Sequence, residues 1–174
     1  MASLVVTLIG PDRPGIVETV AEAVRANNGN WLESRMSHLA GQFAGILLLQ
    51  VPDAEVPALQ SALAELKDRG LKIVVEVDAS ARPSGSEGQL LTVQVVGNDR
   101  PGIVRELTQV LAGHDVNVEE LTTTCEDAPH SGGQIFRAIG RVRAPEGLNP
   151  DLLREELERL AADLMIDVTS EVEV

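Results

Sequence analysis

The apolar positions at the start of the chain predict a strand followed by a helix. Residues 4–9 form a continuous apolar run with β-branched side chains, which is typical of a strand buried on both faces. After a short turn, Ile16, Val20 and Val24 recur every four positions, which indicates the apolar face of an amphipathic helix. Asn27 and the polar residues after it are expected to end this helix by turn chemistry.

The pattern continues with a hairpin, a second helix and a closing strand. Residues 31–39 and 43–51 are two expected strands joined by a short turn at Ala40 and Gly41. Residues 52–70 contain a helix with one apolar side. Apolar and polar residues then alternate over 71–77, as they do in a half-buried strand.

The second half of the chain repeats this order. Gly10–Val17 and Gly97–Val104 lie 87 residues apart and are identical at seven of their eight positions. A repeat of that length fits a small domain, so we expect domains at 1–79 and 89–174, joined by a flexible linker at 80–88. The elements expected in the second domain are strands at 91–96, 117–125, 135–142 and 166–174, a helix along Ile103, Leu107 and Leu111, and a helix lined by Leu153, Leu157, Leu160 and Leu164.

Each half therefore has the element order βαββαβ. With short connections and right-handed crossovers, this order folds into an antiparallel four-stranded sheet with both helices on one face. We expect an α+β protein made of two ferredoxin-like domains. Such sheets have edge strands that must be paired or protected. Two domains can pair their edge strands by lying side by side as one longer sheet.

Composition narrows the classes of function. The net charge is −13 and aromatic residues make up 2%, so the chain repels phosphate backbones and has few rings to stack on bases. We therefore expect no direct nucleic-acid binding. No apolar run approaches the ~20 residues that span a bilayer, and the first residues lack the basic region of a signal peptide. We expect a cytoplasmic protein with no membrane partner.

The repeated turn carries the candidate chemistry. Pro14 fits a first helical turn, where its missing N–H costs nothing, and Gly15 permits close approach of another backbone or a ligand. Asp12 can cap the first amides, and capping alone explains each of these residues. The alternative is that the free amides of Gly15 and Ile16 receive a ligand carboxylate. The same two interpretations, capping or ligand binding, apply to Asp99, Gly102 and Ile103 in the second copy.

Other reactive side chains point to no catalytic or metal site. No Walker loop, dinucleotide-binding glycine motif or triad pattern occurs, so we expect no enzyme activity, no cofactor and no metal. Cys125 precedes the extra loop at 126–131, and His130 lies within it. These two residues lack the spacing of a tetrahedral zinc site. We favour instead a loop that contacts a partner or covers a neighbouring domain. Without an oriented base, Cys125 is expected to be an inert thiol.

Three arginines share one face of a predicted strand. Arg137, Arg141 and Arg143 lie opposite the apolar positions of residues 135–143. They either pair across the hairpin with carboxylates such as Glu119 or form a docking patch for an acidic partner.

The turn sequence and the order of the elements resemble the ACT domain, a small regulatory module that binds amino acids. In the second half, residues 117–121 and 128–132, followed by Ile135 and Phe136, resemble the tandem-ACT proteins related to the glycine cleavage system transcriptional repressor. This resemblance covers nearly the whole chain.

The resemblance implies a ligand site between paired domains, made by the first loop of one domain and the start of the second strand of its neighbour. Asn98 replaces Pro11 and Val118 replaces Trp31, so the two sites are not expected to be equivalent, and we favour the more polar loop at Asn98. Asp12 and its copy would contact a ligand ammonium group or serve only as caps. The implied residues are Asp12, Pro14, Gly15 and Ile16 with Asn30 and Trp31, and Asn98, Asp99, Gly102 and Ile103 with Asn117 and Val118.

The implied function is that of a non-enzymatic sensor. A small amino acid such as glycine or serine would bind at the interfaces of a homo-oligomer and control a protein partner. That partner is expected to be a transcriptional regulator of glycine or one-carbon metabolism, contacted without DNA. Two alternatives remain open: a regulatory subunit of a metabolic enzyme, and a ligand-free interaction scaffold. The repeat occupies both halves, which leaves no room in this sequence for a catalytic domain.

Overall fold

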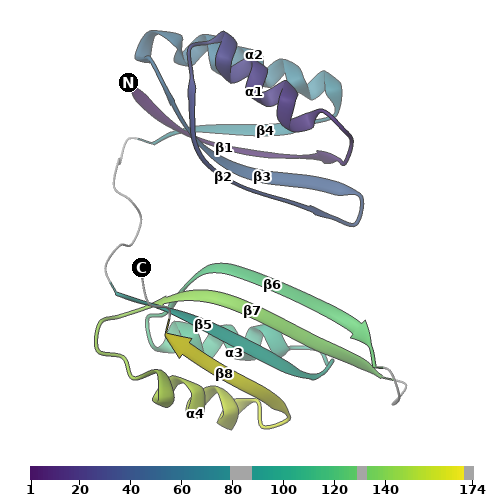
Figure 1. The fold of residues 1–174 in the computed structure, drawn as a ribbon, viewed down its shortest axis with the longest axis vertical. Coiled ribbons are helices and arrows are strands. Elements are labelled where there is room, and N and C mark those ends of the chain that lie inside the picture. The colour runs from purple at the N-terminus through teal and green to yellow at the C-terminus, as the bar shows by residue number, and fades with distance from the viewer. Residues whose placement is uncertain (79–87, 129–132, 171–174) are drawn as a thin grey trace. The chain divides into compact units, whose positions relative to one another are not determined.

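The computed structural model describes residues 1–78, 88–128 and 133–170. The chain divides into two compact units, Met1–Arg82 and Pro83–Val174, each with its own sheet and its own apolar core (Figure 1). Apart from Gly88, the linker expected at 80–88 lies outside the described residues.

The first unit has the predicted order of elements. Its sheet is antiparallel, with the strand order β2-β3-β1-β4. Short 3-10 turns, η1 and η2, flank the second helix. The elements are β1 (Ala2–Pro11), α1 (Ile16–Ala26), β2 (Asn30–Leu39), β3 (Gln42–Val51), η1 (Asp53–Glu55), α2 (Val56–Glu65), η2 (Leu66–Arg69) and β4 (Lys72–Asp78).

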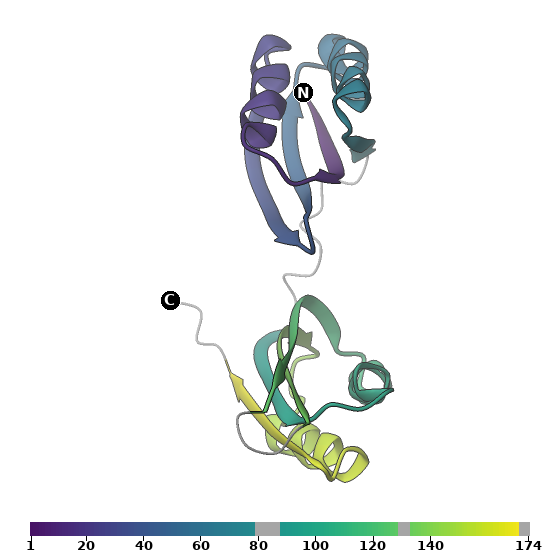
Figure 2. The same cartoon turned by 90° about the vertical axis from the view of Figure 1, so that its right-hand side faces the viewer.

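The second unit repeats this topology. Its sheet has the equivalent strand order β6-β7-β5-β8, again antiparallel throughout. The expected α+β fold, two ferredoxin-like units with both helices on one face of each sheet, is therefore confirmed (Figures 1 and 2). The elements are β5 (Gln89–Asn98), α3 (Ile103–Gly113), β6 (Asn117–Asp127), β7 (Gln134–Ala144), α4 (Pro150–Leu160) and β8 (Leu164–Ser170).

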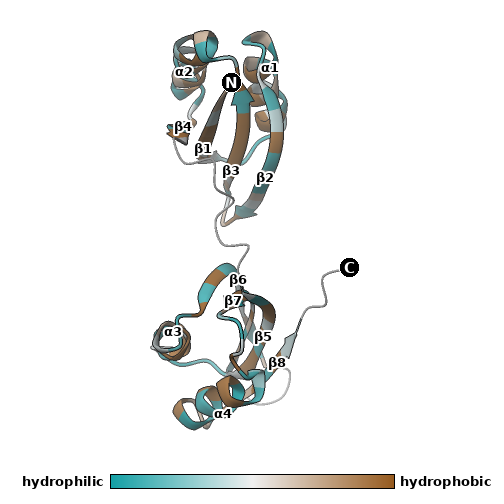
Figure 3. Ribbon diagram, turned by 90° about the vertical axis from the view of Figure 1, so that its left-hand side faces the viewer, coloured by the Kyte–Doolittle hydropathy of each residue, from teal (hydrophilic) through white to brown (hydrophobic). Residues whose placement is uncertain are grey.

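The core of each unit lies between the helices and one face of the sheet. The face predicted for α1 is the buried one, with Ile16, Val20 and Val24 at most 4% exposed. The inner strands are mostly hydrophobic, whereas β2 is largely hydrophilic and exposed (Figure 3). Among the described residues, every helix is too short or too polar to cross a bilayer.

Two expectations about elements are wrong. The first strand is not buried on both faces, because β1 alternates: Leu4 is fully buried, whereas Ile9 is 45% exposed. The last helix does not reach Leu164. It ends at Leu160, since Ala161 leaves the helical conformation, and Leu164 pairs with Gly97 as the first residue of β8.

Candidate ligand site at the strand-to-helix turns

The turn between β1 and α1 is fixed by backbone hydrogen bonds. The amide of Asp12 donates to the carbonyl of Gly41 at 2.9 Å, which ties the turn to the tip of the β2–β3 hairpin. At the other end, the hydroxyl and the amide of Thr19 both donate to the carbonyl of Gly15, at 2.8 and 2.9 Å. In the second unit the amide of Asp99 donates to the carbonyl of Gln134 at 2.8 Å. The backbone of the turn is therefore held in place without any ligand.

Neither helix that follows the repeated turn has a side-chain cap. Gly15 is the N-cap of α1 with φ at 88°, and Gly102 is the N-cap of α3 with φ at 94°. Both lie in the left-handed region, which a residue with a side chain adopts only under strain. The interpretation of Asp12 and Asp99 as caps is therefore wrong, because the cap position falls on the glycine three residues later. The first amides of each helix are left without a side-chain acceptor, as an anion site requires.

A hollow lies beside the uncapped amides of α1. Its volume is about 420 Å³, and a Cβ built on Gly15 would meet nothing within 4 Å. Arg13 reaches across it, because its guanidinium donates to the carbonyl of Arg69. Two arginines and the positive end of a helix border this space together with one carboxylate, that of Glu18, so the cations outnumber the anions along its lining, which favours an anionic group. The lining residues are Arg13, Pro14, Gly15, Ile16, Glu18, Thr19, Arg69 and Leu71.

In the second unit, two carboxylates hold the equivalent arginine. The guanidinium of Arg100 donates to both oxygens of Glu106, at 2.7 and 2.8 Å, and to both oxygens of Asp163, at 2.7 and 3.0 Å. Hydrogen bonds from Arg100 lower the pKa of Glu106 and of Asp163, and these bonds raise the pKa of Arg100. All three groups are therefore charged at neutral pH, and the cation is already neutralised.

Two substitutions between the repeats explain this difference. Glu106 occupies the position of Thr19, and the strand register places Asp163 at the position of Gly70. Glu106 also approaches the turn itself, since a Cβ on Gly102 would lie 3.8 Å from its Oε1. Two carboxylates therefore lie against the arginine of the second turn, whereas the hollow at the first turn is lined by two arginines and one carboxylate, Glu18.

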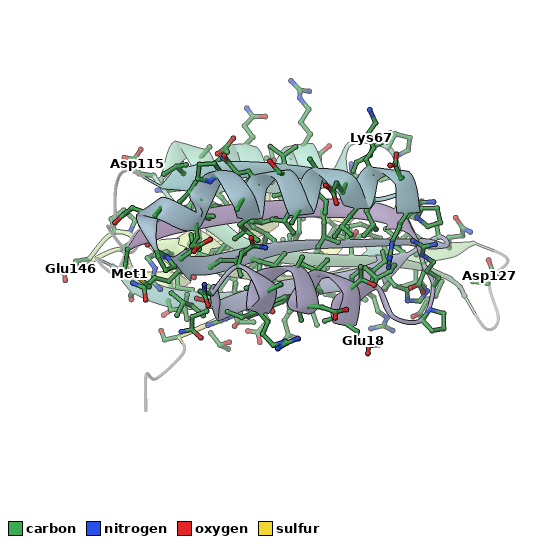
Figure 4. All side chains as sticks on the ribbon, turned by 90° about the horizontal axis from the view of Figure 1, so that it is seen from above. Met1, Glu18, Lys67, Asp115, Asp127 and Glu146 are labelled. Carbon is green, nitrogen blue, oxygen red and sulfur yellow. The ribbon has the colours of Figure 1, made fainter. Side chains whose placement is uncertain are left out.

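The start of the second strand lies far from the turn within each unit. Asn30 pairs with Gln50, which also pairs with Ser3 near the start of β1, whereas the turn follows Pro11 at the opposite end of β1. Strand rise makes this separation roughly 25 Å. Figure 4 shows the same separation, with Met1 towards one end of the first unit and Glu18, just after the turn, towards the other. Asn117, which pairs with Arg143, is placed in the same way in the second unit.

The side chains at these strand starts face different environments. Asn30 and Asn117 are exposed, whereas Trp31 and Val118 are partly buried and pack against the cores of their units. One unit alone thus brings together only the turn residues of a predicted site. The contribution of the second strand from another ACT unit, which the resemblance implies, stays a prediction.

Two of the three arginines on β7 have carboxylate partners across the hairpin. Arg143 Nε donates to Glu119 Oε1 at 2.5 Å, which confirms the cross-hairpin pair, and Arg141 lies 3.9 Å from Glu120. Arg137 is exposed on the same face. The docking interpretation of the three arginines stays a prediction.

The thiol of Cys125 lies beside the extra loop, in surroundings that disfavour a nucleophilic thiolate. Partial desolvation raises the pKa of the exposed Cys125 thiol, and the nearby Asp99 carboxylate raises it further, so the thiolate form is disfavoured. This supports the expectation of an inert thiol. Residues 129–131 of the 126–131 loop, His130 among them, lie outside the described residues.

Sequence reasoning missed two contacts of the second unit. One is the Arg100 cluster, whose only sequence signal is a pair of acidic residues where the first repeat has Thr19 and Gly70. The other joins α3 to α4: His114 Nε2 lies 2.6 Å from Glu156 Oε2, and this hydrogen bond lowers the pKa of Glu156. Asp163 lies 63 residues from Arg100 and Glu156 lies 42 residues from His114, so spacing along the chain could not reveal these two partners.

Comparison with known proteins agrees with this architecture. The ACT-domain family matches residues 2–76 and again residues 91–162. The glycine cleavage system transcriptional repressor of Escherichia coli (strain K12) is 31% identical over 162 residues, covering 92% of this chain and 85% of that protein. The crystal structure of an unknown protein from Galdieria sulphuraria is 32% identical, with a TM-score of 0.86 and coverage of 98% of this chain and 99% of that one. A UPF0237 protein of Methanopyrus kandleri is 35% identical over 77 residues, which are 44% of this chain and 79% of that protein.

Proposed function

The chain belongs to the ACT-domain family as a tandem member, and we propose that it is a non-enzymatic regulatory protein that senses a small amino acid and controls a protein partner. Two family matches and the likeness to a transcriptional repressor along 92% of the chain support a regulatory role. The observation that carries the proposal is the β1–α1 turn, where uncapped amides face a hollow lined by Arg13 and Arg69.

The ligand we propose is an amino acid such as glycine or serine. Its carboxylate would accept hydrogen bonds from the first amides of α1 and gain from the charges of Arg13 and Arg69. Its ammonium group would contact Asp12, which is exposed and does not cap the helix. The turn and the hollow beside it then offer a partner to each end of a zwitterion.

We propose the first turn, and not the turn at Asn98, as the competent site. Sequence favoured the second turn because Asn98 adds a hydrogen-bonding side chain. The charges favour the first, since Arg100 is held by Glu106 and Asp163 and a second anion there would meet two carboxylates. The second turn is then a structural copy.

Completing the site requires the start of the second strand from another ACT unit. We propose that this contribution comes from Asn30 and Trp31, or from Asn117 and Val118. A homo-oligomer of the chain would bring these residues to the turn. A ligand bound across the interface favours the arrangement of units that completes its site. Linkage then lets a partner that distinguishes these arrangements respond to the ligand.

The partner we propose is a protein that controls transcription of glycine or one-carbon metabolism. This rests on the name of the Escherichia coli relative. Control through protein contact fits the net charge of −13, which opposes binding to a phosphate backbone.

The proposal is tested by titrating the full chain with glycine, serine, alanine, acetate and methylamine. The readouts are the emission of Trp31, which is the sole tryptophan, and the melting temperature. We expect a saturable response to glycine or serine, and a weak response to acetate or methylamine, which carry only one of the two charges.

Matched arginine variants locate the site. Because a charged hydrogen bond contributes about 1.5–3 kcal/mol, Arg13→Gln should weaken binding at least about tenfold. Arg100→Gln should leave the affinity unchanged. If no amino acid changes either readout, the chain is a ligand-free scaffold and the sensing role is wrong.

A further inference from the structure

The outer face of the first sheet carries exposed apolar side chains. Both helices of this unit pack on the inner face of the sheet (Figure 1). On the opposite face, Ile9, Ile46 and Val74 are 45%, 47% and 57% exposed. The solvated face of an antiparallel sheet is ordinarily polar, and a contiguous apolar patch on it marks a contact surface. Strand register joins these residues into one patch, the outer patch, made of Val5, Ile9, Ile46, Leu48 and Val74.

The second unit shows that the fold does not require this patch. Its sheet has the same topology, but three of the five equivalent positions are polar or charged. The repeat and the strand register place polar residues at the positions of Val5, Leu48 and Val74, which are, in that order, Thr92, Arg141 and Asp167. The outer patch is therefore a property of the first unit, and a contact made by that unit accounts for it.

Charged side chains of both signs flank the outer patch. Strand register places one cation and one anion on each edge strand beside it, and all four side chains are exposed. The patch and its flanks thus balance in charge, although the whole chain has a net charge of −13. A second copy of the chain is repelled elsewhere but not at this face. The four residues are Glu33 and Arg35 on β2, and Lys72 and Glu76 on β4.

The order of the charges on β2 is complementary to itself. Arg35 and Ile46 lie in one row across the sheet, and Glu33 and Leu48 lie in the neighbouring outer row. A two-fold axis that crosses the strands between these rows places Arg35 of one copy opposite Glu33 of the other, twice in the dimer. The same axis places Ile46 opposite Leu48. Arg35 and Glu33 are 61% and 63% exposed, so both are accessible to a facing copy.

We propose that the outer patch is a contact between two copies of this chain, in which the two first-unit sheets pack face to face as a β-sandwich. Two sheets packed in this way lie roughly 10 Å apart with nearly aligned strands. The contact does not involve the turn at Gly15, so the proposal is independent of amino-acid sensing.

The size of the face predicts a weak dimer. Four strands, each spaced by about 4.8 Å and extending for about seven residues, give roughly 450 Å² per copy. This area lies at the low end of specific protein interfaces, so we expect a reversible dimer with a dissociation constant on the order of 10 µM.

Sedimentation of the full chain over a range of concentrations tests the proposal. Val74→Asp and Leu48→Arg introduce the residues that the second unit has at the same positions, so the fold should accept both. Each removes apolar burial from both copies of a dimer and should weaken association at least about tenfold. The matched control is Val17→Asp on α1, where Val17 is 43% exposed, and it should associate like the wild type.

Circular dichroism and Trp31 emission verify that each variant is folded. A wild type that stays monomeric well above the expected dissociation constant would overturn the proposal, because the outer patch would then await a different protein. Association that is unchanged in both outer-patch variants, or is weakened as much by Val17→Asp, would also overturn it.

A charge exchange tests the two-fold arrangement. Arg35→Glu places like charges opposite each other and should weaken the dimer, whereas adding Glu33→Arg to it should restore association. Failure of the double variant to restore association would contradict the proposed axis. Arg13→Gln should leave sedimentation unchanged, so loss of amino-acid sensing and loss of the dimer are distinguishable.

Discussion

The two strand-to-helix turns share almost all of their sequence but differ in charge. In the first, Arg13 donates to a carbonyl and borders an open hollow. In the second, Arg100 forms ion pairs with both Glu106 and Asp163. The motif itself dictates the backbone, since both turns have an uncapped helix after a left-handed glycine. Residues outside the motif decide what each turn attracts.

The two cores differ in the opposite sense. The first is filled to the edge of its sheet by Trp31, Met36 and Leu47, whereas the second has Gly140 and smaller residues there and retains a pocket. The first unit, whose turn borders a hollow, has the filled core. The second unit, whose Arg100 is paired with two carboxylates, has the core that retains a pocket. The two repeats of one fold thus differ in both their turns and their cores.

Reciprocal core substitutions should produce the largest effect. Leu47→Ala removes a buried side chain and should lower the free energy of unfolding of the first unit by about 2–5 kcal/mol. Gly140→Ala should have the opposite sign, a gain of about 0.4–1 kcal/mol, because a Cβ there makes only ordinary contacts at 3.7–3.8 Å and restricts the unfolded chain.

Urea unfolding of the full chain checks this pair. Trp31 emission follows the first unit, and far-UV circular dichroism follows both. A loss on Gly140→Ala as large as that on Leu47→Ala would show that the two cores are packed equally, which would contradict the comparison.

Much of this fold could be predicted from the sequence. Helix faces such as Ile16, Val20 and Val24 follow a period that only burial against a sheet explains, and the repeat supports each assignment twice. The exposed outer face of β1 was missed, because an apolar Ile9 on a half-buried strand looks the same as a core residue. Leu164 was assigned to a helix because it continues the helical spacing of Leu153, Leu157 and Leu160 although the chain turns after Leu160.

The candidate site was less predictable. The uncapped amides at Gly15 followed from the motif, but Asp12 was equally suited to capping, and only the position of the N-cap excludes that role. The charge difference depends on Asp163, which lies 63 residues from Arg100 in the sequence. Contacts of that kind require the fold.

Acid should distinguish the two units by a smaller effect. The pKa values of Glu106, Asp163 and Glu156 are lowered in the folded second unit, from ordinary values of 4.5, 3.8 and 4.5. A lowered pKa stabilises the fold fully above the ordinary value, and this contribution is lost as the pH falls through the folded value. Among the described residues of the first unit, only exposed Asp53 is shifted in this way, by the N-terminal amine.

We therefore expect the second unit to lose more stability than the first between roughly pH 5 and pH 2, the range in which these carboxyls titrate. Methyl signals of each unit during acid titration provide the measurement. Arg100→Gln should flatten the pH dependence of the second unit, whereas Arg13→Gln should change neither unit. Equal slopes in the wild type and Arg100→Gln would show that the arginine cluster does not set the acid response.

Calorimetric titration of glycine and serine into the wild type, Gly15→Val and Gly102→Val tests the unequal turns most directly. The two substitutions impose matched backbone strain, because the glycines have φ of 88° and 94°. The account predicts saturable heat from the wild type and Gly102→Val, and none from a folded Gly15→Val. Binding that survives in Gly15→Val but is lost in Gly102→Val would contradict it and place the ligand at the second turn.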